Sequence, residues 1–94
     1  MSLTLASVIS RNESNFLANP VGEEIIILNM ETGDYLGLNT VGASIWEHLQ
    51  ESGTVQKIVD KLMAEYEIDS ETCTTETISY LEKINKLGLL KIDS

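Results

Sequence analysis

Short apolar runs of strand length occur in the first 40 residues, and in the rest of the chain apolar residues recur every three to four positions. The run EEIIILN at 23–29 is β-branched and apolar on both faces, which indicates a strand that is central in its sheet or covered on both sides. The run DYLGL at 34–38 is expected to return as a hairpin, since Gly33 in the intervening METGD can take the left-handed conformation of a short turn. The stretch 15–24, with one proline and one glycine, is expected to be an edge strand or arm that ends in a turn.

Three amphipathic helices are predicted after these strands, because apolar residues recur at helical spacing and a polar residue able to cap a helix precedes each stripe. The predicted caps are Asn39 or Thr40 for the first helix, Thr54 for the second, and Asp69 or Ser70 for the third. Gly53 is expected to end the first helix and Gly88 the third. The predicted apolar stripe of the third helix is Ile78, Leu81, Ile84 and Leu87.

Strands followed by helices predict an α+β domain in which an antiparallel sheet lies on one side of a helical cluster. Residues 1–15 are polar and lack a clear periodicity, so we interpret them as an N-terminal arm that precedes a domain at 16–92. The residues LLKI at 89–92 form a short apolar exit with the composition of a strand fragment. A chain of 94 residues fits one domain with a single modest core.

The composition narrows the classes of function. The formal charge of −9 disfavours binding to nucleic-acid phosphates, which depends on Lys and Arg, and the six basic residues make no dense patch. No apolar run reaches the ~18 residues that a membrane span needs. The N-terminus lacks the charged start and apolar middle of a signal peptide, so we expect a cytoplasmic protein without a membrane partner. The single cysteine excludes an internal disulfide and a zinc site built on a cysteine pair.

Residues that could carry catalysis are few and scattered. Nucleophilic catalysis needs a nucleophile beside a base, and Cys73 and His48 lie on different predicted helices with nothing in the sequence to bring them together. We interpret Cys73 as a small packing residue near a helix start, and a thiol enzyme that uses it is kept as an alternative. His48 has no second ligand at metal spacing, there is no glycine-rich phosphate loop, and Trp46 is expected in the core. No enzymatic activity, metal or cofactor is therefore predicted.

Three helices with a small hairpin also fit a winged-helix DNA-binding regulator, which is the alternative function. Such a protein needs basic residues on the third helix to contact DNA. The third predicted helix, SETCTTETISYLEKINKLG, has three glutamates before its first lysine. The sequence therefore favours a partner other than DNA.

Three consecutive stretches resemble the PqqD-like domains, which are also called RiPP recognition elements. They are IIILNMETGDYLGLNTVGASIWEHL, TVQKIVDKLMAEYEID and ISYLEKINKLGLL, and the likeness extends over about residues 16–92. The shared features are the hairpin with its glycine turn, Leu38-Asn39 at the start of the first helix, the Ile45-Trp46 pair, and a last helix that ends in LGLL. Each feature is weak alone, and it is their combination, order and spacing that carry the resemblance.

The resemblance implies a winged-helix-like fold, with a three-stranded antiparallel sheet followed by three helices, and no enzymatic activity. It implies that the protein binds the leader region of a ribosomally synthesised precursor peptide and presents it to a modifying enzyme or leader peptidase. The leader would lie as an extra strand on the third strand of the sheet, in a groove walled by the third helix. The turn NMETGD and the helix end QESGT depart from the pattern of coenzyme PQQ synthesis protein D. The IW helix and the length look more like the discrete leader-binding proteins of lasso peptide clusters.

The residues themselves point to the same edge. If the strand 23–29 is central, the strand 34–38 is an edge whose unpaired N–H and C=O groups a peptide can satisfy by strand addition. Gly37 would let a second backbone approach, Tyr35 offers a large flat contact, and the third helix is expected to expose small and medium residues beside them. The predicted peptide-binding residues are Asp34, Tyr35, Leu36, Gly37, Leu38, Cys73, Thr74, Thr77, Tyr80, Leu81 and Ile84. Such an edge can also pair with its copy in a homodimer.

Overall fold

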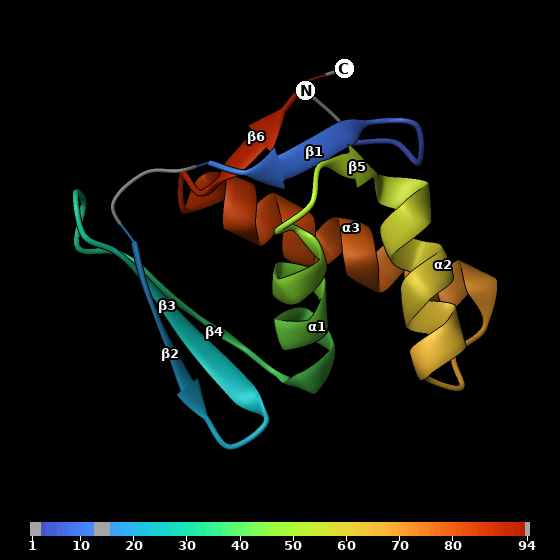
Figure 1. The fold of residues 1–94 in the computed structure, drawn as a ribbon, viewed down its shortest axis with the longest axis horizontal. Helices are drawn as coiled ribbons and strands as arrows, with labels where there is room; N and C mark the ends of the chain where they lie inside the picture. Colours follow the sequence, from blue (N-terminus) through green and yellow to red (C-terminus); the bar gives the residue numbers. More distant parts are fainter. Residues whose placement is uncertain (1–2, 13–15, 94) are drawn as a thin grey trace.

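A computed structural model describes residues 3–12 and 16–93 of the chain (Figure 1). Its elements, in chain order, are β1 (Val8–Arg11), β2 (Phe16–Val21), β3 (Glu24–Asn29), β4 (Tyr35–Leu38), α1 (Thr40–His48), β5 (Gly53–Thr54), α2 (Val55–Glu65), α3 (Ser70–Lys86) and β6 (Leu90–Ile92). The fold is α+β with antiparallel pairing, as predicted. Strands and helices alternate more than the sequence indicated, because β5 separates α1 from α2. β6 follows α3, where the sequence indicated a strand fragment at 89–92.

β2, β3 and β4 form an antiparallel sheet in which β3 is the central strand, as its apolar composition predicted. The β3–β4 register pairs Ile25 with Leu38 and Leu28 with Tyr35. Gly33 has a φ of 80°, which confirms the left-handed glycine expected in this turn. Figure 1 shows the sheet extending to one side of the helices, with α1 between it and α2. The sheet therefore leaves β4 as an edge.

Only one face of this sheet is covered by the described residues. Ile25 and Ile27 point into the core, whereas the opposite face exposes apolar side chains to solvent. We call that opposite face the outer sheet face and define it by Leu17, Val21, Ile26 and Tyr35, which are 55%, 54%, 43% and 75% exposed. β3 is central in the sheet, as one of the two expected alternatives had it, and its apolar outer side is open to solvent.

The interpretation of residues 1–15 as a polar arm outside the domain is wrong for β1, which is part of the fold. It lies between β5 and β6, where Ile9 pairs with both Gly53 and Ile92 (Figure 1). Ile9 is fully buried and Leu3 also packs in the core. A four-residue strand with one fully buried side chain has too little periodicity to be recognised, and its partners are distant in sequence. Residues 1–2 and 13–15 of the predicted arm lie outside the described residues.

Each helix begins at one of the predicted caps. The side chain of Asn39 accepts the N–H of Gly42, and Thr54 and Asp69 cap the other two helices in the same way. α1 ends at His48, so the prediction that Gly53 ends it is wrong. Gly53 instead belongs to β5, because its backbone pairs with β1. Within the described residues, no helix is both long enough and apolar enough to cross a membrane.

Trp46 joins α1 to both sheets, which confirms its predicted place in the core. Its side chain is almost fully buried, and the Phe16 ring meets it edge-on with the ring centroids 5.2 Å apart. The Arg11 guanidinium lies 4.1 Å from the Trp46 ring centroid and donates two hydrogen bonds, of 2.7 and 3.1 Å, to the Trp46 carbonyl oxygen. One tryptophan therefore connects β1, β2 and α1 and fixes where the hairpin sheet stands.

Candidate functional site

The register of the hairpin determines which backbone groups of β4 are left open. The N–H of Asn29 donates to the carbonyl oxygen of Asp34 at 2.8 Å, so Asp34 turns its carbonyl toward β3. Successive residues of an antiparallel strand turn their N–H and C=O groups to opposite sides, so those of Leu36 also face β3. The N–H and C=O groups of Tyr35 and Gly37 face the open edge. These are the groups that a further strand could pair with.

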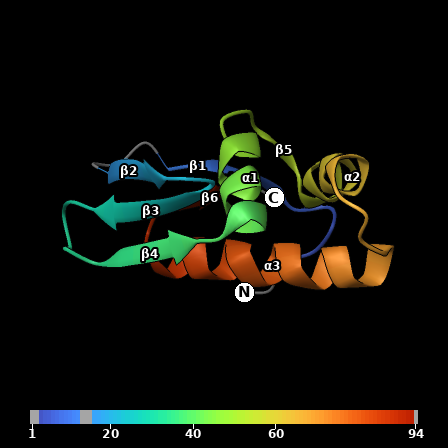
Figure 2. The same ribbon diagram turned by 90° about the horizontal axis from the view of Figure 1, so that it is seen from below.

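A groove of about 400 Å³ lies between β4 and the C-terminal part of α3. Figure 2 shows β4 and α3 running in opposite directions, so that the start of β4 lies toward the end of α3. The groove is lined by Gly33, Asp34, Tyr35 and Leu36 from the hairpin and by Lys83, Lys86 and Leu87 from the helix and its end. The open edge of β4 borders this groove, so a strand added there would point every second side chain toward α3.

Asn29 connects the two walls of the groove at its hairpin end. Its buried side chain donates from Nδ2 to the carbonyl oxygen of Leu87 at 2.8 Å. Its Oδ1 accepts the N–H groups of Glu31 and Thr32 at 2.9 and 3.4 Å, within the hairpin turn. Gly88, with a φ of 85°, follows directly, and a Cβ on it would lie 3.3 Å from Asn29 Nδ2. One side chain thus ties the turn to the end of α3 and sets their separation.

Tyr80 packs near the other end of β4. A Cβ on Gly42 would lie only 2.9 Å from Cε1 of Tyr80 and 3.2 Å from Cβ of Leu38, so the glycine lets the ring lie against α1. Burial raises the pKa of the Tyr80 hydroxyl. The Nζ of Lys83 stands 5.3 Å from the Tyr80 ring centroid. The Tyr80 ring therefore packs against α1 and also lies next to the ammonium group of Lys83.

The predicted peptide-binding residues fall into three groups by exposure. Exposed are Asp34, Tyr35 and Gly37, and partly buried are Leu36, Thr74 and Tyr80. Buried are Leu38, Cys73, Thr77, Leu81 and Ile84. The expectation that the third helix exposes Cys73, Thr77 and Leu81 is wrong, because their four-residue spacing puts all three on the helix face that packs in the core. Asp34, Tyr35 and Leu36 line the groove together, and direct contact between a peptide and the other residues stays a prediction.

Four residues of the site were missed by the sequence reasoning: Asn29, Lys83, Lys86 and Leu87. Lys83 and Lys86 lie in the last turn of α3, where the helix dipole favours lysines whichever way they point. Their presence in the sequence therefore does not indicate a binding site. The only signal for Asn29 is an amide at the end of an apolar strand, and its partner is 58 residues away. The groove depends on this pairing of distant segments.

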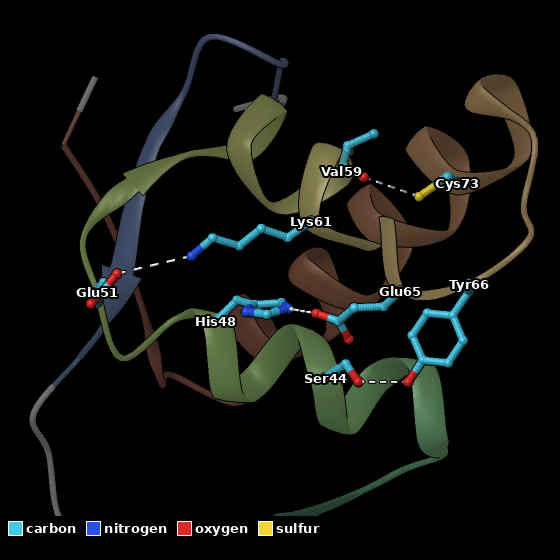
Figure 3. A network of polar contacts seen from close by, with 8 residues as sticks. All are labelled: Ser44, His48, Glu51, Val59, Lys61, Glu65, Tyr66 and Cys73. Atoms are coloured by element: carbon cyan, nitrogen blue, oxygen red, sulfur yellow. Dashed lines mark hydrogen bonds and ion pairs between the residues drawn. The ribbon is translucent and has the colours of Figure 1, made fainter. Parts of the chain in front are cut away.

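The two residues considered for catalysis do not meet. The Sγ of Cys73 donates to the carbonyl oxygen of Val59 at 3.7 Å, and Nε2 of His48 lies 2.7 Å from Oε1 of Glu65. Figure 3 shows these as separate contacts, one between α3 and α2 and the other between α1 and α2. Burial raises the pKa of the Cys73 thiol, which disfavours the nucleophilic thiolate. Among the described residues, no three His, Cys, Asp or Glu side chains gather where they could hold a metal ion.

The family whose members are described as coenzyme PQQ synthesis protein D (PqqD) matches residues 24–90, which contain β3, β4 and all three helices. The chain belongs to the PqqD family. This confirms the resemblance found in the sequence, and the β2–β3–β4 sheet followed by three helices is the arrangement that the resemblance implied. The sequences of curated proteins gave no match.

Two solved structures share the PqqD-family fold of this chain. One is described as TbiB1 in complex with the TbiA(beta) leader peptide; it is 29% identical, the match covers 87% of this chain and 94% of that one, and the TM-score is 0.76. The other is described as lasso peptide synthetase B1 complexed with the leader peptide. It is 16% identical with a TM-score of 0.73, and the match covers 88% of this chain and 96% of that one. At this lower identity the likeness concerns the fold.

Proposed function

We propose that this PqqD-family protein binds the leader region of a ribosomally synthesised precursor peptide as an added strand on β4. The observation that carries the proposal is the open edge of β4, where the backbone groups of Tyr35 and Gly37 face outward beside a groove walled by α3. A peptide can pair with such an edge by strand addition, which is a recurring mode of peptide recognition. The complex of the similar protein TbiB1 with a leader peptide supports the same class of ligand here.

Affinity and selectivity come from different parts of this site. Hydrogen bonds from Tyr35 and Gly37 to the peptide backbone supply affinity for any extended peptide. Alternate side chains of the added strand point to opposite sides, so one set enters the groove over Leu36 and Leu87 and supplies selectivity. Tyr80 and Thr74 are the partly buried α3 residues that we expect nearest to the peptide. The buried α3 residues Cys73, Thr77, Leu81 and Ile84 hold the helix against the core.

We further propose that the protein has no catalytic activity of its own. It would present the bound leader, in the cytoplasm where the precursor is made, to a modifying enzyme or leader peptidase of a lasso peptide pathway. The IW helix and the turn that departs from the PQQ synthesis pattern support this pathway. The outer sheet face is where we expect the enzyme to bind, since exposed apolar side chains that cluster commonly mark an interaction surface.

We also propose that β4 pairs with β4 of a second copy when no leader is present. An unpaired edge is a template for any strand, and the same edge on two copies can form an antiparallel pair. Because leader and second copy would use the same groups, adding leader should convert dimers into monomers with one peptide each. Sedimentation velocity with and without peptide measures this, and a dimer that persists with bound leader would place its interface elsewhere.

The test of the main proposal is an NMR titration of the ¹⁵N-labelled protein with the leader of the precursor peptide encoded beside this gene. We expect the largest amide shifts at Tyr35 and Gly37 and in α3 near Tyr80 and Lys83. The free N–H groups of β4 should also become protected from hydrogen exchange, since they gain acceptors. A scrambled leader of the same composition is the control.

Saturable binding that leaves both β4 and α3 unperturbed would refute the site, and absence of binding would refute the function. A DNA duplex titrated at low salt tests the regulator alternative, which the −9 charge disfavours.

A further inference from the structure

The groove is positively charged, although the protein as a whole is acidic. The chain has 15 acidic residues and only six Lys and Arg, and two of those six, Lys83 and Lys86, line the groove. Both side chains are exposed and neither has a carboxylate within ion-pair distance among the described residues. Asp34 is the single acidic residue of the groove lining. The groove therefore carries a net positive charge against the −9 of the whole chain.

The remainder of the groove lining shapes what these lysines can contact. Leu36 on the hairpin and Leu87 after α3 form an apolar floor beside them. Lys83 lies over the ring of Tyr80, with its Nζ 5.3 Å from the ring centroid, which holds its ammonium group along the groove without neutralising it. Lys83 and Lys86 are three residues apart on α3, so they project from the same face of the helix. Residues at this spacing have their Cβ atoms about 5–6 Å apart.

This inference rests on the proposed strand addition of a leader peptide to β4. We propose that Lys83 and Lys86 form a carboxylate-binding subsite, and that the leader bound here combines an aliphatic side chain with an Asp or Glu side chain on the face turned toward α3. The aliphatic residue packs on Leu36 and Leu87. The carboxylate accepts hydrogen bonds from one or both ammonium groups. Side chains two positions apart in a strand share a face, so the two features would be separated by one residue.

The acidic surface strengthens the selection that such a subsite makes. Two of the three lysines outside the groove pair with the protein's own carboxylates, Lys61 with Glu51 at 3.9 Å and Lys91 with Asp93 at 4.0 Å. A peptide with a lysine in place of the acidic residue would meet like charge at the groove and lose its carboxylate contact. Leaders without an inward carboxylate would bind through the backbone and the aliphatic side chain, with lower affinity and less dependence on salt.

The test compares the Kd of the synthetic leader encoded beside this gene for wild-type protein and for Lys83→Gln/Lys86→Gln and Lys83→Glu/Lys86→Glu variants. A matched control, Lys57→Glu/Lys91→Glu, makes the same change in net charge as the glutamate variant, on exposed lysines of α2 and β6. We expect about 10-fold weaker binding for the glutamine variant and a larger loss for the glutamate variant, with less than about 3-fold change for the control. Raising NaCl from 50 to 300 mM should weaken wild-type binding and leave the glutamine variant nearly unaffected.

Variants of the leader peptide test the same contact from the other side. Leaders in which each Asp or Glu is replaced in turn by the matching amide should reveal one position whose loss weakens wild-type binding and leaves the glutamine variant unchanged. A lysine at that position should bind the Lys83→Glu/Lys86→Glu variant more tightly than the wild-type leader does. Equal losses in the groove variants and the control, or no sensitive carboxylate, would overturn the subsite while leaving leader binding intact. A wild-type protein that binds no leader would overturn the proposed function and the subsite together.

Discussion

A proline at Gly37 tests whether the edge of β4 is where the peptide binds. The hairpin register turns the N–H of Gly37 to the open edge, so Gly37→Pro removes one donor from that edge and no bond of the β3–β4 pair. Proline is tolerated on edge strands in this orientation, and it restrains the preceding Leu36 to the extended backbone that it already has. A Cβ at position 37 would meet no described heavy atom within 4 Å. The variant should therefore fold.

The expected loss of affinity follows from one hydrogen bond. The proline leaves a peptide carbonyl without its partner inside the bound strand, which costs about 1–3 kcal/mol, or roughly 5- to 150-fold in Kd. Gly37→Ala is the matched control because it keeps the N–H and places its methyl group in open space on the outer sheet face. It should bind the leader within about 2-fold of wild type, and its stability should stay equal or rise by about 0.4–1 kcal/mol.

Leu36→Pro separates the two sides of the strand. The N–H of Leu36 faces Ile27 of β3, so this proline removes a bond of the sheet and should lower the free energy of unfolding by about 1–3 kcal/mol or more. Isothermal titration calorimetry gives the Kd of each variant, and urea unfolding gives its stability. If Gly37→Pro binds as tightly as wild type, the peptide does not pair with this edge. If Gly37→Ala loses as much affinity as the proline, the glycine itself is needed and the hydrogen-bond argument fails.

Three further predictions concern the hairpin end of the groove and the first turn of α3. Asn29→Ala removes three hydrogen bonds of a buried side chain and should lower the free energy of unfolding by about 2–4 kcal/mol in urea titrations, whereas an unchanged midpoint would contradict the bridge to Leu87. Burial raises the pKa of the Cys73 thiol, so iodoacetamide at pH 8 should label it no faster than the protein opens; rapid labelling of folded protein would revive the thiol-enzyme alternative. The hydrogen bond from the N–H of Thr72 lowers the pKa of Asp69 below its ordinary 3.8, so this cap stabilises the fold above that pH and is lost as pH falls through the lowered value. Asp69→Asn should keep the cap and remove this part of the acid dependence, measured by thermal unfolding between pH 2 and 6; an unchanged slope would contradict it.

Much of the fold could be predicted because its signals are local. These signals involve residues no more than about four positions apart in the sequence. They are the left-handed Gly33, the helix caps Asn39, Thr54 and Asp69, and the apolar strand 24–29. The edge at 34–38 followed from the same information, since a short hairpin that returns beside a central strand leaves its second strand on the outside.

The helix face was harder to predict for a physical reason. Thr77 is polar and Cys73 is small, so both looked suited to a surface pocket, yet both lie buried on the stripe that packs in the core. Burying a hydroxyl costs free energy and burying a small side chain gains little, so such residues do not by themselves indicate the buried side of an amphipathic helix. The neighbouring large residues decide the rotation of the helix.

The sequence by itself determined the β3–β4 hairpin, the three helices, the family, and the strand on which a peptide is expected to lie. Only the tertiary structure decided that β1 joins β5 and β6, that Asn29 reaches Leu87, and that Lys83 and Lys86 stand beside β4. Each of these depends on contacts between segments far apart along the chain, and the burial of Trp46 among β1, β2 and α1 sets where those segments meet. The open edge was present in the sequence pattern, and the charged groove beside it exists only in the packed domain.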